Sequence, residues 1–165
     1  MQLTRAADYG VRVMIHLASA DTNPRSSLSE LADAAEVSPA FLSKVLQRLV
    51  RSGLVASWRG KKGGFELLER GRCASLLDIL QALDGVPELN ICLLSGGCHR
   101  SPWCAAHPVW QEAQVRMRDT LSAATLEQLV LDTRARQASL SRRADRQVGP
   151  TSLVRPTGRS PGQAS

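Results

Sequence analysis

Three equally spaced cysteines are the residues of this chain best suited to chemistry. Cys92, Cys98 and Cys104 lie in the stretch ICLLSGGCHRSPWCAAH, with five residues between each cysteine and the next. Structural zinc sites usually contain closer pairs of cysteines, because a tight turn then brings two thiolates onto one ion. Wider arcs that contain glycine and proline can wrap a larger group, and thiolates are the preferred ligands of iron–sulfur clusters. The spacing favours a cluster, with zinc or unrelated thiols as the alternatives.

Three thiolates leave one iron of such a cluster without a cysteine, so an oxygen or nitrogen atom from elsewhere must complete the site.

The remaining cysteine, Cys73, lies among small residues before a predicted helix and is expected to be a buried structural thiol. A redox enzyme with Cys104 as nucleophile is disfavoured, because only His107 offers a positive charge nearby. The chain contains neither a Ser–His–Asp pattern nor a phosphate-binding loop. We therefore expect a protein that is not an enzyme.

Charge and composition narrow the class of protein further. The first 20 residues do not resemble a signal peptide, and no apolar run is long enough for a membrane span, so we expect a cytoplasmic protein with reduced thiols. Arg134 and the residues after it contain seven arginines and one acid, which accounts for the net charge of +6. Residues 37–65 contain six basic side chains and no acid. Such a patch attracts polyanions, and double-stranded DNA is the expected partner.

The elements that carry this basic patch are marked by helix signals. Thr4 can cap a first helix, and Ser27 with Glu30 forms a capping box that opens a second, short helix. Ser38 followed by Pro39 opens a third helix, which Gly53 ends. A short helix, a tight turn and a longer helix are typical of a helix-turn-helix.

A β-hairpin is predicted directly after the third helix. LVASW and FELLE are strand-like, and RGKKGG between them is typical of a tight turn. A helix-turn-helix followed by such a hairpin is a winged helix, whose third helix enters the major groove while the wing reaches the adjacent minor groove. The predicted DNA-binding residues lie on these two elements: Ser38, Ala40, Ser43, Lys44, Gln47, Arg48, Arg51, Arg59, Lys61 and Lys62. Arg48 and Arg51, near the end of the helix, are expected to contact phosphate.

The second half of the chain is predicted to contain two further helices. Ser75 and Asp78 form a second capping box, and Gly85 ends that helix. Pro108 suits the start of a helix over residues 108–133 with an apolar stripe: Trp110, Ala113, Met117, Leu121 and Ala124. We expect this stripe to pack against a second copy of the chain, which would place two reading helices about one DNA turn apart on a palindrome.

The predicted fold is mainly α with a small β-hairpin. A winged helix-turn-helix domain spans 1–85, with its first helix also at the dimer interface, and a cysteine-rich cluster-binding loop spans 86–107. A dimerisation helix region spans 108–133, and a disordered basic tail spans 134–165, because arginine, serine, glycine and proline cannot bury enough apolar surface to order it.

The opening MQLTRAADYGVRVM, the block SPAFLSKVLQRLVRSGLVASWRGKKGG and the three cysteines resemble a known family over residues 1–133. This family comprises dimeric iron–sulfur winged-helix repressors and includes the nitric-oxide-sensing NsrR, the cluster-assembly regulator IscR and the iron regulator RirA. The resemblance implies a homodimeric transcription factor whose cluster state sets its affinity for the operator.

The resemblance implies two alternatives for the fourth ligand. Asp8 matches a carboxylate that in NsrR-like members reaches a 4Fe-4S cluster across the dimer. His107 matches the histidine that in IscR-like members binds a 2Fe-2S cluster. DYG around Asp8, the wing RGKKGG and CHRSPWC are more similar to NsrR, so we favour Asp8, a 4Fe-4S cluster and a repressor released by nitric oxide or another cluster-reactive signal. An IscR-like regulator of cluster assembly or iron homeostasis is the alternative, and a zinc-stabilised DNA-binding module is a second one.

Overall fold

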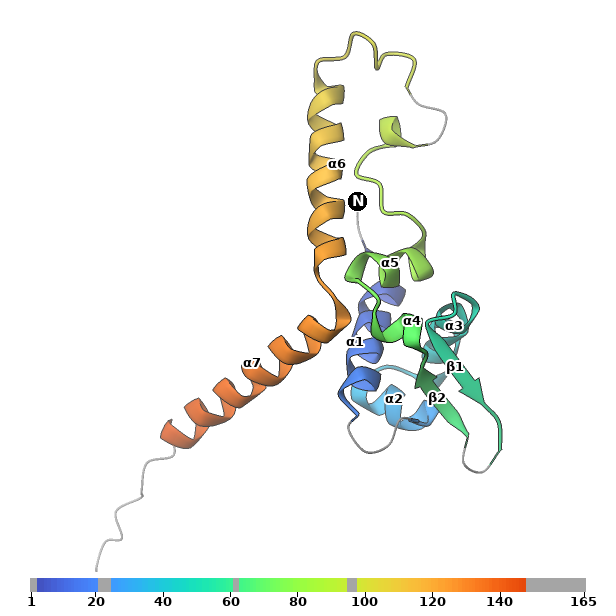
Figure 1. The fold of residues 1–165 in the computed structure, drawn as a ribbon, viewed down its shortest axis with the longest axis vertical. Helices are drawn as coiled ribbons and strands as arrows, with labels where there is room; N and C mark the ends of the chain where they lie inside the picture. Colours follow the sequence, from blue (N-terminus) through green and yellow to red (C-terminus); the bar gives the residue numbers. More distant parts are fainter. Residues whose placement is uncertain (1–2, 21–24, 61–62, 95–97, 148–165) are drawn as a thin grey trace, which may run out of the picture. The chain divides into compact units, whose positions relative to one another are not determined.

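The computed structural model describes residues 3–20, 25–60, 63–94 and 98–147, and side chains up to residue 143. The chain divides into one compact unit up to Asp132 and a second that begins at Thr133. The elements of the first unit are mainly helical, with one antiparallel hairpin (Figure 1): α1 (Arg5–Ser19), α2 (Leu28–Ala35), α3 (Pro39–Arg51), β1 (Val55–Trp58), β2 (Gly64–Leu67), α4 (Glu69–Arg72), α5 (Leu76–Asp84), the 3-10 helix η1 (Ile91–Leu93), α6 (Ala106–Ala123) and the start of α7 (Leu126–Gln147). The predicted winged helix-turn-helix is confirmed.

The predicted caps lie where the sequence signals place them. The hydroxyl groups of Thr4, Ser27 and Ser38 accept hydrogen bonds from backbone N–H groups in the first turns of α1, α2 and α3. Gly53 follows α3 with a φ of 71°, a left-handed conformation that glycine adopts without steric cost. Between α2 and α3, Glu36 adopts a φ of 56° and forms the tight turn of the helix-turn-helix.

Two capping boxes open α2 and α5. The Ser27 backbone N–H donates to Glu30 at 2.7 Å, and this bond lowers the pKa of the Glu30 carboxyl below its ordinary value of 4.5. The Ser75 hydroxyl donates to Asp78 at 2.6 Å and lowers the pKa of that carboxyl below 3.8. Because both pKa values are lower in the folded chain, the two capping boxes stabilise the fold fully at a pH above the ordinary pKa values of the carboxyl groups. That contribution is lost as the pH falls through the lowered pKa values.

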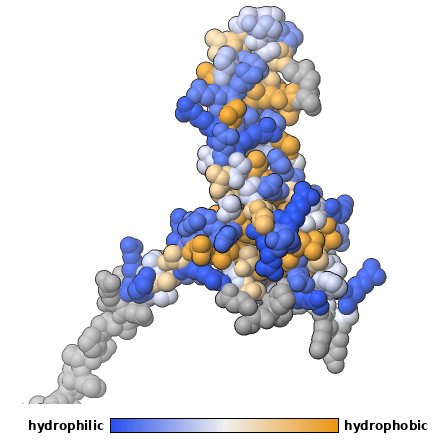
Figure 2. Space-filling view, viewed as in Figure 1, coloured by the Kyte–Doolittle hydropathy of each residue, from blue (hydrophilic) through white to orange (hydrophobic). Residues whose placement is uncertain are grey.

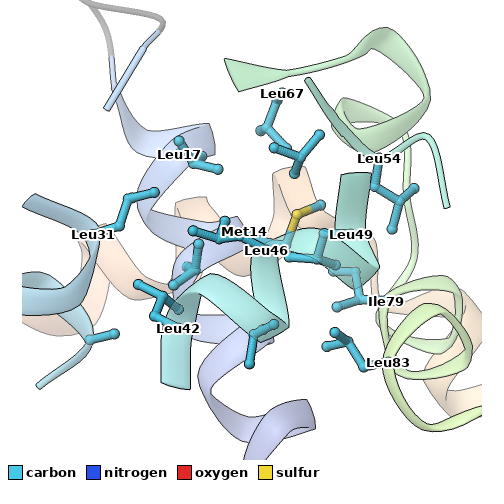
Figure 3. Close-up of a cluster of buried hydrophobic side chains, with 14 of the residues drawn as sticks. Met14, Leu17, Leu31, Leu42, Leu46, Leu49, Leu54, Leu67, Ile79 and Leu83 are labelled. Atoms are coloured by element: carbon cyan, nitrogen blue, oxygen red, sulfur yellow. The ribbon is translucent and has the colours of Figure 1, made fainter. Parts of the chain in front are cut away.

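The core of the winged domain is aliphatic. Figure 3 shows side chains from α1, α2, α3, α5 and the hairpin meeting around Met14, with Leu46 and Leu49 from α3 among them. Met14, Leu46 and Leu49 are fully buried. Each buried side chain of this size stabilises the fold by about 1.5–3 kcal/mol. This core holds α3 with its polar face outward.

The prediction of one helix over 108–133 is wrong, because the chain breaks at Ala124 and Thr125. Leu76 donates from its backbone to the Ala124 carbonyl at 2.8 Å, and Leu126 donates to the Ala74 carbonyl at 2.9 Å. Leu126 is fully buried in the core of the winged domain. Thr125 then caps α7 by accepting from the backbone of Gln128 at 3.2 Å. Burial of Leu126 and the bridge to residues 74–76 outweigh continuation of α6.

The basic tail also differs from the prediction over part of its length. Residues 134–147 belong to α7 and are helical, whereas we expected disorder there. Arginine, alanine, glutamine and leucine are good helix formers, so this stretch extends a helix that Thr125 has already nucleated. Residues 148–165 lie outside the described part. No helix among the described residues combines the length and apolar character that crossing a membrane requires.

Close packing between α1 and α5 leads to a stability prediction. A Cβ at Gly10 would overlap the Leu83 side chain. We therefore expect Gly10→Ala to destabilise the protein by about 1–3 kcal/mol, as overpacked cores do. Adding Leu83→Ala removes the obstructing atoms, so the double variant should lose less stability than the two single variants combined. Urea unfolding of all three variants measures this, and strict additivity would contradict the overlap.

Candidate nucleic-acid interface and metal centre

The outward face of α3 presents most of the predicted base-reading residues to solvent. Ala40, Lys44 and Gln47 are exposed, and Ser43 is half-buried. Ser38 is exposed but already engaged, because its hydroxyl accepts from the backbone N–H of Phe41 at 3.4 Å. The first turns of α3 therefore carry small and polar groups on an exposed surface, which is the arrangement required of a helix that enters the major groove.

The two arginines at the end of α3 make contacts within the chain. Arg51 donates through Nε to the Gln47 carbonyl at 3.2 Å, within its own helix. Arg48 donates to the Leu83 carbonyl of α5 at 2.6 Å and lies 3.9 Å from the Asp84 carboxylate. Its guanidinium is thus bound to a neighbouring helix, a role that the sequence did not indicate.

The wing is a short antiparallel hairpin with an exposed arginine. Val55 pairs with Leu67, and Trp58 pairs with Gly64. Arg59 is exposed, and the turn closes where the Gly63 backbone N–H donates to the Gly60 carbonyl at 2.8 Å. The predicted contacts Lys61 and Lys62 lie outside the described residues.

A third extended segment, just before α2, fixes the wing to the helix-turn-helix. Ser26 and Phe65 exchange two backbone hydrogen bonds, of 3.0 and 2.8 Å. Arg25 donates to the Glu66 carboxylate at 3.0 Å, and its guanidinium lies over the Trp58 ring, 4.3 Å from the centroid. No sequence pattern indicates this role of Arg25, since only the pairing of Ser26 with Phe65 brings it to the hairpin.

Arg25 is expected to position the wing for DNA binding. Arg25→Ala removes an ion pair and a cation–π contact that together contribute on the order of 1 kcal/mol. We therefore expect DNA affinity to fall roughly fivefold, as fluorescence anisotropy can measure. Arg25→Lys keeps the charge but loses the planar stacking, so its DNA affinity should fall by a similar factor. Full affinity in Arg25→Lys would contradict the positioning role and indicate a simple charge effect.

The cysteine segment, residues 91–107, presents three free thiols. Cys92 lies in η1, and Cys92, Cys98 and Cys104 are each half-buried. The Cys104 backbone N–H donates to the Arg100 carbonyl at 2.9 Å, and the His107 N–H donates to the Cys104 carbonyl at 3.0 Å. These turns join the last thiol to the first turn of α6.

A buried glutamine on α6 anchors the chain that enters this segment. Gln114 donates to the Pro87 carbonyl at 2.7 Å and accepts from the Leu89 backbone N–H at 2.8 Å. Arg118, one turn further along α6, lies 3.7 Å from the Glu88 carboxylate. The amide satisfies two backbone groups of residues 87–89, so it fixes the position from which the cysteine segment leaves α5.

The two predicted fourth ligands lie in different environments. Asp8 is exposed and forms an ion pair with Arg12 at 3.0 Å. His107 is half-buried, and its Nδ1 atom is buried without a hydrogen-bond partner in the part of the chain that the structure describes. A buried imidazole nitrogen without a partner is unfavourable, which makes it available to a ligand.

The donor atoms match an iron–sulfur cluster in their chemistry, although they are not gathered. Thiols and an imidazole nitrogen are the ligands that such clusters use. Within residues 3–20, 25–60, 63–94 and 98–147, no three cysteine, histidine or acidic side chains are close enough together to hold a metal ion. The segment would have to close around such a group.

Cys73 is exposed, so the prediction of a buried structural thiol is wrong. It ends the short helix α4, and Ala74 beside it takes the buried position. Ala74 is also the residue whose carbonyl accepts from Leu126. The contact with the start of α7 therefore turns Ala74 inward and Cys73 outward.

The predicted dimer stripe lies on a side of α6 that other residues of the same chain partly cover. Trp110 is 40% exposed, and Ala113, Met117 and Leu121 are half-buried near the Gln114 anchor. Figure 2 shows apolar surface along α6 and the cysteine segment, where Ile91 and Trp103 are 79% and 71% exposed. These exposed side chains leave a substantial apolar area of α6 and of the described part of the cysteine segment uncovered.

Comparison with known proteins places this architecture in a family. Residues 3–132 match the model of the Rrf2 family, described as an iron-dependent transcriptional regulator. The chain belongs to the Rrf2 family. Rv1287 of Mycobacterium tuberculosis strain H37Rv is 33% identical over 127 residues, covering 76% of this chain and 79% of that protein. The HTH-type transcriptional regulator IscR of Enterobacter sp. strain 638 is 30% identical over 145 residues, covering 84% and 88%.

A solved structure of the Rrf2 type supports the same fold. CymR of B. subtilis, described as the global cysteine regulator, superposes with a TM-score of 0.65 at 26% identity and covers 79% of this chain and 96% of its own. The chain is therefore a DNA-binding transcriptional regulator with a winged helix. Because the matches include both an iron-dependent description and a cysteine regulator, membership of the Rrf2 family alone leaves the signal open.

Proposed function

We propose that this chain is a cytoplasmic, non-enzymatic repressor that binds palindromic operators as a homodimer and requires an iron–sulfur cluster for full affinity. The observation that carries the proposal is the set of three free, half-buried thiols on one segment beside α6. Thiols kept for structure alone are usually fully buried, whereas these three remain accessible to a ligand. Cys92, Cys98 and Cys104 would hold the cluster.

The fourth ligand distinguishes two forms of the proposal. In the first, Asp8 exchanges its partner Arg12 for a 4Fe-4S cluster held mainly by the other subunit. When bound, such a cluster would supply an iron without a thiolate, a point that nitric oxide can reach. The resemblance to NsrR-like proteins supports this form.

The second form is an IscR-like regulator of cluster assembly or iron homeostasis with a 2Fe-2S cluster. It is supported by His107, whose buried Nδ1 atom has no partner among the described residues, three positions after Cys104. Asp8, in contrast, is exposed and already paired with Arg12. The contacts within one chain thus favour His107, while the sequence resemblance favours Asp8.

Anaerobic absorption spectra with iron and sulfide counts test the proposal. We expect the purified protein to contain iron and sulfide, and nitric oxide to change the spectrum and weaken DNA binding. Loss of the spectrum in Asp8→Ala alone supports the first form, and loss in His107→Ala alone supports the second. Colourless, zinc-loaded protein would support a zinc-stabilised module instead. Metal-free protein with unchanged DNA affinity would overturn cluster dependence altogether.

A further inference from the structure

Asp84, the last residue of α5, joins α5 to the start of α1. Its carboxylate accepts from the Thr4 backbone N–H at 3.1 Å and from the Thr4 hydroxyl at 2.7 Å. The same hydroxyl caps α1 by accepting from the Ala7 backbone N–H at 3.3 Å. The Asp84 side chain itself is 18% exposed, and its hydrogen bonds with Thr4 lie at the surface of the domain. The first turn of α1 is therefore fixed to the end of α5.

The DNA-reading helix α3 is also bonded to the end of α5. Arg48 of α3 donates to the Leu83 carbonyl at 2.6 Å and lies 3.9 Å from Asp84. Arg48 follows Gln47 directly and lies one helical turn after Lys44, and both of these residues belong to the exposed reading face. A displacement of the end of α5 therefore acts on the part of α3 that faces DNA.

Two candidate ligands of the metal centre, Cys92 and Asp8, are also connected to Asp84. Cys92 follows eight positions later, through the stretch that Gln114 fixes to α6. Asp8 lies one turn into α1, and its backbone N–H donates to the Thr4 carbonyl at 3.2 Å. A cluster held by Cys92 and Asp8 would therefore be connected to Asp84 along the chain on one side and through the Thr4 hydrogen bonds on the other.

We propose that Asp84 is a positioning residue that links the cysteine segment and the start of α1 to the reading helix, with Arg48 as its partner on α3. The inference deepens the proposed function and rests on it. It assigns Arg48 a role different from the phosphate contact expected from its place near the end of α3. Tightly packed residues that have only discrete arrangements transmit small shifts. The close packing of Leu83, which directly precedes Asp84, against Gly10 is a contact of this type.

The test compares operator affinity with and without the cluster. The probe is a duplex selected from random DNA by the full-length, cluster-loaded protein, and the ratio of the two dissociation constants is measured. Asp84→Asn and Arg48→Gln are each expected to reduce this ratio at least fivefold while iron content stays at the wild-type level. Asp33→Asn, an exposed acid on α2, and Arg51→Gln, at the end of α3, are the matched controls and should retain the wild-type ratio.

Salt dependence separates positioning from phosphate contact. A lost phosphate contact makes the log–log salt slope shallower by about 0.9, which we expect for Arg51→Gln but not for Arg48→Gln. A wild-type ratio in Arg48→Gln would overturn the inference, even if Asp84→Asn failed to fold. A ratio of one in the wild-type protein would overturn cluster-dependent regulation as well, so the two failures are distinguishable.

Discussion

Trp110→Glu is expected to convert a dimer into a monomer and to weaken operator binding about 100-fold. Trp110 is 40% exposed on α6 and belongs to the stripe predicted to meet a second copy. A carboxylate there would have to be buried against apolar surface, at a cost of several kcal/mol. A monomer binds one half-site only and loses the high effective concentration of the second reading helix. Sedimentation velocity and fluorescence anisotropy measure the two effects.

Val115→Glu provides the matched control for this prediction. Val115 is 55% exposed and lies on the same helix, about 140° around the helix axis from Trp110. The same charge introduced there should leave the association state and the DNA affinity near wild type. A dimeric Trp110→Glu protein with unchanged affinity would show that the stripe packs only within its own chain.

Cys98→Ala is expected to abolish cluster binding and to reduce operator affinity at least tenfold. Cys98 is the middle of the three thiols, and its loss leaves too few protein ligands to hold a cluster stably. Cys98 is not part of the core of the winged domain, so thermal unfolding of that domain should change little. Iron and sulfide counts on anaerobically purified protein, followed by DNA titration, test both parts.

Cys73→Ala is the control within the same chain. Cys73 is a free, exposed thiol outside the cysteine segment, so its replacement should leave iron content, spectrum and affinity unchanged. Equal iron loss in both variants would indicate non-specific thiol binding. Unchanged iron in Cys98→Ala would contradict the assignment of the metal centre.

Local signals were sufficient to predict the winged domain. The caps at Thr4, Ser27 and Ser38 depend on side chains that bond to backbone groups three residues away. Such contacts form within a single turn, so a sequence pattern contains all the participants. The hairpin was predictable for the same reason, since its strands and its glycine-rich turn are contiguous.

Contacts between distant segments decided the rest. The helix predicted over 108–133 breaks because Leu126 is buried against residues that lie about 50 positions earlier. The signal T-L-E-Q from Thr125 to Gln128 has the residue spacing of a capping box and could have marked this break. The same long-range contact turned Ala74 inward and left Cys73 exposed.

The sequence by itself determined the helix-turn-helix and the wing, and it indicated three thiols as the candidate metal centre. Only the tertiary structure decided what Arg25, Arg48 and Gln114 do. Each of these side chains satisfies or pairs with a group between 25 and 41 positions away. Long polar side chains have many partners within reach in an unfolded chain. The packing of the apolar core selects one partner by fixing which backbone carbonyl or carboxylate lies beside them.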